Sequence, residues 1–218
     1  LTAAERQTIR AALAEKARDG VRVKLLYDRF GSFATMCSRF FGQFMRNQPN
    51  LEVHPFSHFN LRSPWRVQLR NHRKVLIIDG RTAFIGGINI SRDNDLRLGR
   101  PPRHIHDLHC LIRGPAVGEL QFSFLRDWHY VSGVPPAELF REEYFPLLEQ
   151  AGETVVRVIA SGPGQEYEAT AKVFHTAAAV AQESIWIINP YFIPDRAFWS
   201  ALGMAVARGV EVRVVVPE

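Results

Sequence analysis

A helix–glycine–strand unit occurs twice in this chain and constrains the fold more than any other feature of the sequence. The segment "ALAEKARDGVRVKLLYD" (residues 12–28) aligns without gaps to "ALGMAVARGVEVRVVVP" (residues 201–217). In both copies a helical pattern ends at a glycine, Gly20 or Gly209, and an apolar strand pattern follows. A true repeat predicts an α/β protein with one near-complete lobe and the beginning of a second. The alternative is chance, because unrelated α/β chains also contain helix–glycine–strand units.

Composition along the chain suggests how these lobes are divided. We expect a first lobe over residues 1–135, with a mixed β-sheet flanked by helices. Residues 136–153 lie in a stretch rich in Pro, Gly and Glu and are predicted to be a linker. A truncated second lobe is expected over residues 154–218, with a strand in "VVRVIASGPG", a helix over 166–182 and a buried strand in "SIWIINPYFIP".

Apolar periodicity, glycine and proline indicate the elements of the first lobe. Helices are predicted over residues 2–20, 31–48 and 115–131. Strands are predicted over residues 21–28, 51–56, 74–79, 82–87 and 106–112. The third and fourth of these strands would form a hairpin with a tight turn at Gly80–Arg81.

The charge of the chain points to an anionic partner. The net charge is +5, and residues 53–78 contain arginines, a lysine and histidines but no acidic residue. Such a patch favours phospholipid head groups or nucleic acid, although a solvated basic face is the simpler alternative. The two cysteines do not suggest a disulfide framework. No stretch is long and apolar enough for a transmembrane helix, so any membrane anchor is expected outside this chain.

The candidate reactive residues lie in "HRKVLIIDGRTAFIGGIN" (residues 72–89). His72 and Lys74 are separated by one residue, so a strand would place both side chains on one face. An imidazole beside an ammonium is a poor structural pair, but both can address a phosphate. A neutral His72 can attack phosphorus as a nucleophile, and Asn89 can donate a hydrogen bond to a phosphate oxygen.

The rest of this segment contributes geometry and a recognisable spacing. Gly86 and Gly87 would let backbone and ligand approach closely. Asp79 ends the first strand of the hairpin. The pattern H-x-K-x4-D-x6-G-x2-N resembles the signature of the phospholipase D superfamily at every position.

The resemblance extends over essentially the whole chain. The stretches "YDRFGSF", "LRNHRKVLIIDGRTAFIGGINIS", "DLHCLIRGPAV", "LQFSFLRDW" and "NPYFIPD" resemble the bacterial cardiolipin synthase branch, in that order. This branch has two lobes whose His-Lys-Asp motifs face one active site, and the second motif would lie beyond residue 218. The chain departs from the family at Ile105 and His106, where an aromatic residue and an arginine are usual.

The resemblance implies a mechanism that uses no cofactor and no metal. His72 would attack phosphorus to form a phosphohistidine, and the histidine of the second motif would act as acid and then as base. Lys74 and Asn89 would stabilise the phosphate oxygens, while Asp79 would fix local geometry. The donor would be phosphatidylglycerol, the acceptor another phospholipid, and the place the surface of the bacterial cytoplasmic membrane.

Two further residues are candidates for supporting roles. Asp107 and His109 share one face of a predicted strand, where they could line the site or orient His72. The alternative is an ordinary polar pair on the surface. His104 and His106 lie close to His109 in the sequence, but no cysteine or glutamate joins them in the spacing of a metal site.

Three functions remain open at this point. The first is a phosphatidyltransferase, which the branch-specific stretches favour. The second is a phospholipase D-like phosphodiesterase or nuclease that uses the same motif; the partial second lobe argues against a self-sufficient single-motif nuclease. The third is a catalytically incomplete fragment that binds anionic lipid, since the second histidine is not in this chain.

Overall fold

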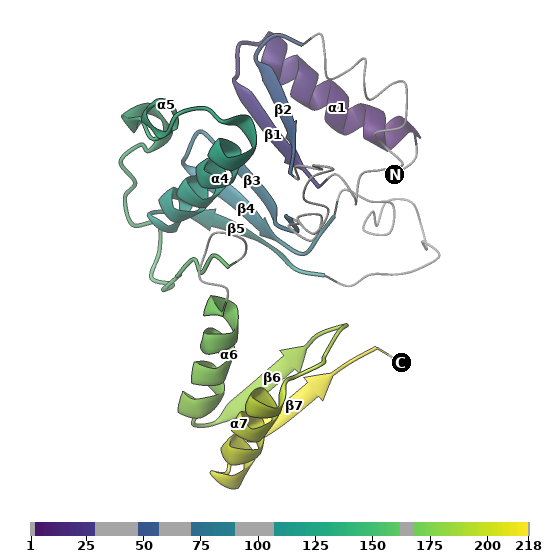
Figure 1. Cartoon of the computed structure of the whole chain (residues 1–218), viewed down its shortest axis with the longest axis vertical. Helices are drawn as coiled ribbons and strands as arrows, with labels where there is room; N and C mark the ends of the chain where they lie inside the picture. Colours follow the sequence, from purple (N-terminus) through teal and green to yellow (C-terminus); the bar gives the residue numbers. More distant parts are fainter. Residues whose placement is uncertain (1–2, 29–47, 57–70, 90–106, 162–167, 218) are drawn as a thin grey trace, which may run out of the picture. The chain divides into compact units, whose positions relative to one another are not determined.

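The computed structural model describes residues 3–28, 48–56, 71–89, 107–161 and 168–217 (Figure 1). They fall into two compact units, and the boundary lies between Val158 and Ile159. The first unit contains α1 (Ala3–Arg18), β1 (Val23–Tyr27), β2 (Leu51–Pro55), β3 (Lys74–Ile78), β4 (Thr82–Gly86), β5 (His109–Arg113), α4 (Ala116–Ser132), α5 (Pro136–Leu139) and the 3-10 helix η4 (Glu142–Tyr144). The second contains α6 (Ala169–Val180), β6 (Ser184–Ile188), α7 (Arg196–Ala207) and β7 (Glu211–Val215).

The repeated segments have the same local structure. The predicted helix, glycine and strand are confirmed as α1–Gly20–β1 and as α7–Gly209–β7. Gly20 has φ 89° and Gly209 has φ 91°, the left-handed conformation that stops a helix with little strain only at glycine. After each glycine the next amide donates to a helix carbonyl, at 3.0 Å for Val21 and 3.1 Å for Val210. The two copies therefore share their helix stop and, at five aligned positions, the same residue.

The predicted hairpin is confirmed, but its turn lies one residue earlier than expected. The strands β3 and β4 are antiparallel, and the Arg81 N–H donates to the Ile78 carbonyl at 3.0 Å. The central residues are Asp79, with φ 54°, and Gly80, with φ 64°. Two positive φ values are typical of a type I′ turn, and aspartate tolerates this conformation better than arginine does. A Cβ at Gly80 would also lie 2.8 Å from the ring of Pro146.

The described strands of the first unit do not form the single mixed sheet that the sequence predicted. The pair β1–β2 is parallel, and β3–β4–β5 is a separate antiparallel sheet. The helix α4 packs on both: Trp128 forms a cluster with Leu26 of β1, and Val117 packs with Ala83 of β4. The side chains of Asn71 and Arg73 lie between the two sheets and line a pocket there. The sheets are therefore joined by side chains and by α4.

The amphipathic pattern of α4 explains why this helix can pack against both sheets. Its buried residues recur every three or four positions and are Val117, Leu120, Gln121, Leu125 and Trp128. The helix ends before Gly133, which has φ 71°. Residues near its start face the antiparallel sheet, and residues near its end face the parallel pair. A single helix therefore provides the common core of the first unit.

Residues 136–153, predicted to be a linker, instead pack against the first unit. Leu139 is only 1% exposed and lies in the cluster that contains Trp128. A Cβ at Gly114 would lie 3.3 Å from the backbone nitrogen of Ala151. The prolines and glycines of this stretch shape a close-fitting surface segment. The boundary between units follows it, at Val158.

The strand predicted in "VVRVIASGPG" does not form in residues 155–161, the part of it that the structure describes. The reason lies in its contacts with the first unit. The Val158 N–H donates to the Glu119 carboxylate of α4 at 3.3 Å, and the Val158 side chain packs against the cluster around Val117. Val158 therefore adds to the first core, whereas Val155, at the start of the segment, is 95% exposed.

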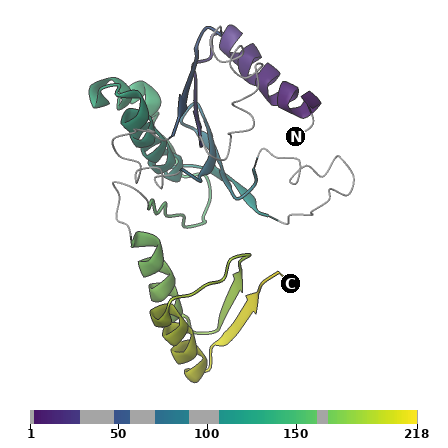
Figure 2. The ribbon, with the colours of Figure 1, turned by 45° about the vertical axis from the view of Figure 1, so that its right-hand side comes forward.

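The second unit is a two-layer βα arrangement. Its strands β6 and β7 are parallel, and α6 and α7 lie on the same side of them (Figures 1 and 2). The predicted helix over 166–182 is confirmed as α6 within the described residues. The prediction that β6 is buried is wrong: Trp186 is 67% exposed and Ile188 is 79% exposed. Both point away from the helical layer because successive strand residues alternate between faces.

Several predictions concern residues outside the described ranges. They include the helix over 31–48, most of the basic window and the histidines at 104 and 106. None of the helices that the structure describes is both long and apolar enough to cross a bilayer.

Candidate functional site

His72 and Lys74 meet at the start of β3. His72 lies two residues before Lys74, which is the first residue of the strand. The Lys74 Nζ atom lies 2.8 Å from the His72 Nδ1 atom and donates to the His72 carbonyl at 2.7 Å. The expectation that both side chains lie on one side is therefore confirmed. This contact uses Nδ1, so Nε2 is the ring nitrogen that does not contact Lys74.

The charge of Lys74 is set by burial and by two carboxylates. Partial burial lowers the pKa of Lys74, while the negative charges of Asp107 and Asp28 act in the opposite direction. Asp28 was not among the residues predicted from the sequence. Its only signal there is position: it directly follows β1, and polar residues after the carboxyl end of a parallel strand often line binding sites. Burial and the two carboxylates therefore change the pKa of Lys74 in opposite directions, and burial has the larger effect.

Two glycines allow β4 and the segment before β5 to approach closely beside Lys74. Lys74 pairs with Gly86, which in turn pairs with His109. A Cβ at Gly86 would lie 2.6 Å from the His109 Cα atom, and a Cβ at Gly87 would overlap the Asp107 carboxylate. The Gly87 N–H donates to the Leu108 carbonyl at 2.9 Å. These two positions therefore need glycine for steric reasons.

Asp107 and His109 lie on the same side of the sheet as Lys74. The Asp107 carboxylate accepts from the Leu108 N–H at 2.8 Å and contributes to the field at Lys74. His109 is half-buried, and among the described residues its Nδ1 atom has no hydrogen-bond partner. The structure thus places both residues near Lys74.

Asp79 and Asn89 have different positions relative to this group. Asp79 lies in the turn at the far end of β3 from Lys74, so the structure does not bring it together with His72. It shapes the hairpin, as its φ of 54° shows. Asn89 is exposed and follows β4 at the end where Gly86 pairs with Lys74. Asn89 is therefore at the same end of the hairpin as Lys74.

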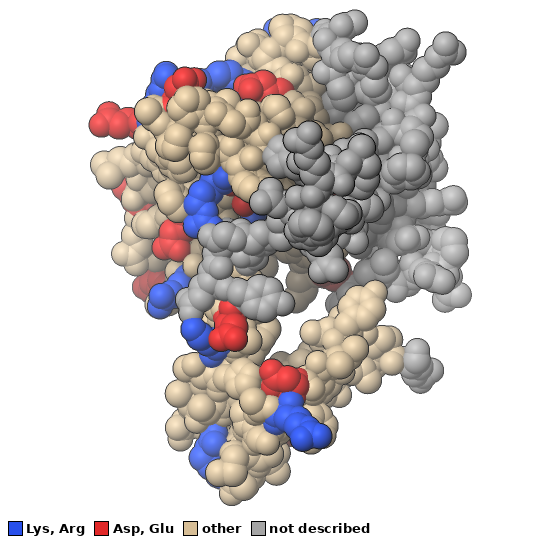
Figure 3. Space-filling view, in the orientation of Figure 1, with Lys and Arg blue, Asp and Glu red and all other residues tan. Residues whose placement is uncertain are grey.

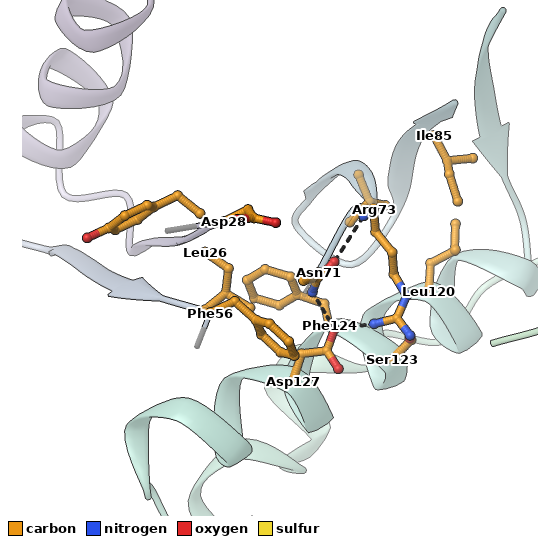
Figure 4. Close-up of a pocket in the computed structure, with 12 residues that line it drawn as sticks. Leu26, Asp28, Phe56, Asn71, Arg73, Ile85, Leu120, Ser123, Phe124 and Asp127 are labelled. Carbon is orange, nitrogen blue, oxygen red and sulfur yellow. Dashed lines mark hydrogen bonds and ion pairs between the residues drawn. The ribbon is translucent and has the colours of Figure 1, made fainter. Parts of the chain in front are cut away.

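A pocket of about 90 Å³ lies behind the motif, on the side that faces α4 (Figure 4). Its polar residues are Asp28, Asn71, Arg73, Ser123 and Asp127. The rest of the lining is mainly apolar and comes from β1, β3, β4 and α4. Its volume is well below the roughly 300 Å³ of a small-molecule site. His72 does not line this pocket and is exposed.

The basic patch predicted over residues 53–78 falls mostly outside the described residues. On the face shown in Figure 3, positive and negative side chains are interspersed over the described part of the first unit. The cationic groups that the structure places at the motif are Lys74 and Arg73. Within the described residues, the positive charge near His72 therefore comes from Arg73 and Lys74.

Comparison with known proteins identifies the family of this chain. The family model described as "Cardiolipin synthase, PLD-like domain" matches residues 2–128 and 176–218. A cardiolipin synthase of Geobacillus kaustophilus is 38% identical over 217 residues, which cover 97% of this chain and 41% of that protein. Cardiolipin synthase A of Pseudomonas fluorescens is 37% identical over 211 residues, 94% of this chain and 41% of that protein. The chain thus spans about two fifths of the length of these relatives. It belongs to the phospholipase D-like domain family of the cardiolipin synthases.

Proposed function

We propose that this chain carries the first half of the active site of a phosphatidyltransferase of the cardiolipin synthase type. The observation that supports this most is the contact between His72 and Lys74 at the exposed entry to β3. His72 Nε2 attacks the phosphorus of phosphatidylglycerol, the bond to glycerol breaks, and a phosphatidyl-histidine forms. The free glycerol hydroxyl of a second phosphatidylglycerol then displaces the histidine. The products are one cardiolipin and one glycerol.

The resting contact between His72 and Lys74 requires a rearrangement before attack. While the ammonium donates to Nδ1, the proton of a neutral imidazole is on Nε2, and this nitrogen has no free lone pair. An arriving phosphate draws Lys74 onto its oxygens, together with Asn89. Nδ1 can then carry the ring proton, and Nε2 becomes the nucleophile.

The remaining half of the site is proposed to come from the rest of a longer parent protein. Its facing lobe supplies a second histidine, which protonates the leaving glycerol and then takes the proton of the acceptor hydroxyl. Since the donor is a membrane lipid, the parent acts at the surface of the bacterial cytoplasmic membrane. It is held there peripherally or by a segment outside this chain.

The test compares the full-length parent with the 218-residue chain on vesicles of phosphatidylglycerol. We expect the parent to form cardiolipin and glycerol in equal amounts, and the chain alone to form little of either. Release of phosphatidic acid without cardiolipin would show a hydrolase instead. Salt-sensitive cleavage of DNA, with no action on lipid, would show a nuclease.

One prediction follows from the close approach at Gly87. Substitution Gly87→Ala in the parent should lower cardiolipin formation about tenfold or more, because the new Cβ displaces the Asp107 carboxylate from its place beside Lys74. The matched control is Gly118→Ala in α4, where a Cβ meets nothing within 4 Å. This control should retain activity and gain up to about 1 kcal/mol of stability. Equal activity of the two variants would contradict the steric argument.

A further inference from the structure

The backbone around His72 is not held by a strand. Residues 71–73 precede β3, so the ladder hydrogen bonds that fix the strand begin only at Lys74. A nucleophile must nevertheless be held within fractions of an ångström of its line of attack. Other contacts must therefore fix the backbone at this position.

These contacts converge on Asp127 of α4 (Figure 4). Its Oδ2 atom accepts a hydrogen bond from the Asn71 side-chain amide at 2.8 Å and forms an ion pair with the Arg73 guanidinium. Asn71 Oδ1 in turn accepts the backbone N–H of Arg73 at 3.0 Å, which closes a turn around His72. One carboxylate oxygen therefore holds the residues on both sides of His72. We call Asn71, Arg73 and Asp127 the Asp127 clamp.

Burial makes this arrangement stronger than a surface ion pair. The side chain of Asp127 is 13% exposed and that of Arg73 is 30% exposed. At such sites water screens the pair less, and removing one partner leaves a charge without compensation. By contrast, the ion pair between Arg22 and Glu143 is 56% and 44% exposed and is of the kind that contributes little.

The clamp lies on the side of the motif opposite to the substrate. Asn71 and Arg73 line the pocket that faces α4, while His72 and Lys74 contact each other on the other side. The clamp can therefore set the position of the His72 backbone without touching a bound phosphate. This separates its role from that of Lys74.

We propose that Asp127 is a positioning residue, which acts through Asn71 and Arg73 to hold His72 in line with the phosphate. The inference rests on the proposed role of His72 as the nucleophile. It assigns a task in the reaction to a carboxylate 55 residues further along the chain, on α4. A purely structural ion pair would affect stability alone.

The kinetic test uses Asp127→Asn and Asp127→Ala in the full-length parent. We expect kcat for cardiolipin formation to fall about 100-fold in Asp127→Ala and less in Asp127→Asn, with little change in KM. The amide of asparagine keeps the shape and can still accept from Arg73, so this variant is expected to fold. The matched control is Glu119→Ala on the same helix, whose carboxylate accepts from Val158 at 3.3 Å. Its kcat should remain unchanged.

A double-mutant cycle with Arg73→Ala provides a second kinetic measurement. Arg73→Ala removes one of the two links that Asp127→Ala removes, so the double variant should lose hardly more activity than Asp127→Ala alone. Additive losses would contradict the clamp. If Asp127→Ala does not fold, the cycle is measured with Asp127→Asn instead.

A spectroscopic measurement separates the clamp from the proposed function. In the 218-residue chain with labelled histidine, the Cε1–H resonance of His72 should show faster ring motion in Asp127→Asn and remain unchanged in Glu119→Ala. This readout needs no substrate. If the wild-type parent makes no cardiolipin but the resonance responds, the proposed function fails and the clamp stands. If neither the resonance nor kcat differs from the Glu119→Ala control, the clamp is overturned.

Discussion

Replacement of His72 by glutamine is expected to abolish cardiolipin formation by the full-length parent, with kcat reduced on the order of 10⁴-fold or more. Glutamine can fill the space of the imidazole and donate a hydrogen bond, but it has no nitrogen lone pair that can attack phosphorus. Glycerol release from phosphatidylglycerol measures the loss directly. Mass spectrometry of the quenched wild-type enzyme should find the phosphatidyl group on the peptide that contains His72.

The matched control for this experiment is another histidine of the same unit. His129 lies on α4, where its Nδ1 atom is 2.7 Å from the Val134 carbonyl. The variant His129→Gln should turn over at close to the wild-type rate, although it can be slightly less stable. Substantial glycerol release by His72→Gln, or a phosphatidyl group on another residue, would refute the assignment of the nucleophile.

Loss of Lys74 should have the second largest effect. The variant Lys74→Ala is expected to lower kcat/KM about 10²- to 10³-fold, because it removes a cation from the oxygens on which negative charge develops. Lys74→Arg should restore only part of this activity, since a planar guanidinium cannot replace a compact ammonium beside the His72 ring. Lys24→Ala is the control: Lys24 pairs with Glu52 at 2.6 Å and lies over the ring of Trp128, away from the motif.

The pH dependence of the same variants tests the electrostatics of the site. Because burial lowers the pKa of Lys74 below 10.5, the ammonium and its phosphate contact are lost at a lower pH than for a free lysine. Stability changes in the opposite direction. Between the folded pKa of Lys74 and 10.5, this side chain binds more protons in the unfolded chain than in the folded one. The contribution of Lys74 to the free energy of unfolding therefore rises with pH in this range. Activity should therefore decline on the alkaline side while the fold becomes no weaker. Lys74→Arg, which keeps its charge, should not show this decline.

Local patterns predicted the parts of this protein that depend on neighbours in the chain. The helix stops at Gly20 and Gly209 follow from a single residue type and are found in both copies. Strand alternation predicted that His72 and Lys74 lie on one side, and their contact agrees, although the strand itself begins only at Lys74. The turn lies one residue before its predicted position because Asp79, like glycine, tolerates the left-handed conformation.

Contacts between distant residues could not be predicted in this way. Asn71 and Asp127 are separated by 56 positions, and no periodicity relates a polar residue before a strand to an acid on a helix. Asp28 enters the field of Lys74 only through the tertiary fold. The exposure of Trp186 was missed because an apolar run has the same sequence whether one or both faces of its strand are covered.

The position of α4 between two sheets has a consequence for how this protein can change. The same helix supplies the buried Trp128 and, one residue earlier, the carboxylate of Asp127. A core substitution that shifts α4 by a fraction of an ångström therefore also shifts the anchor of the His72 backbone. If His72 is the nucleophile as proposed, substitutions that repack the core around α4 should change both the thermal stability and the turnover of the parent protein.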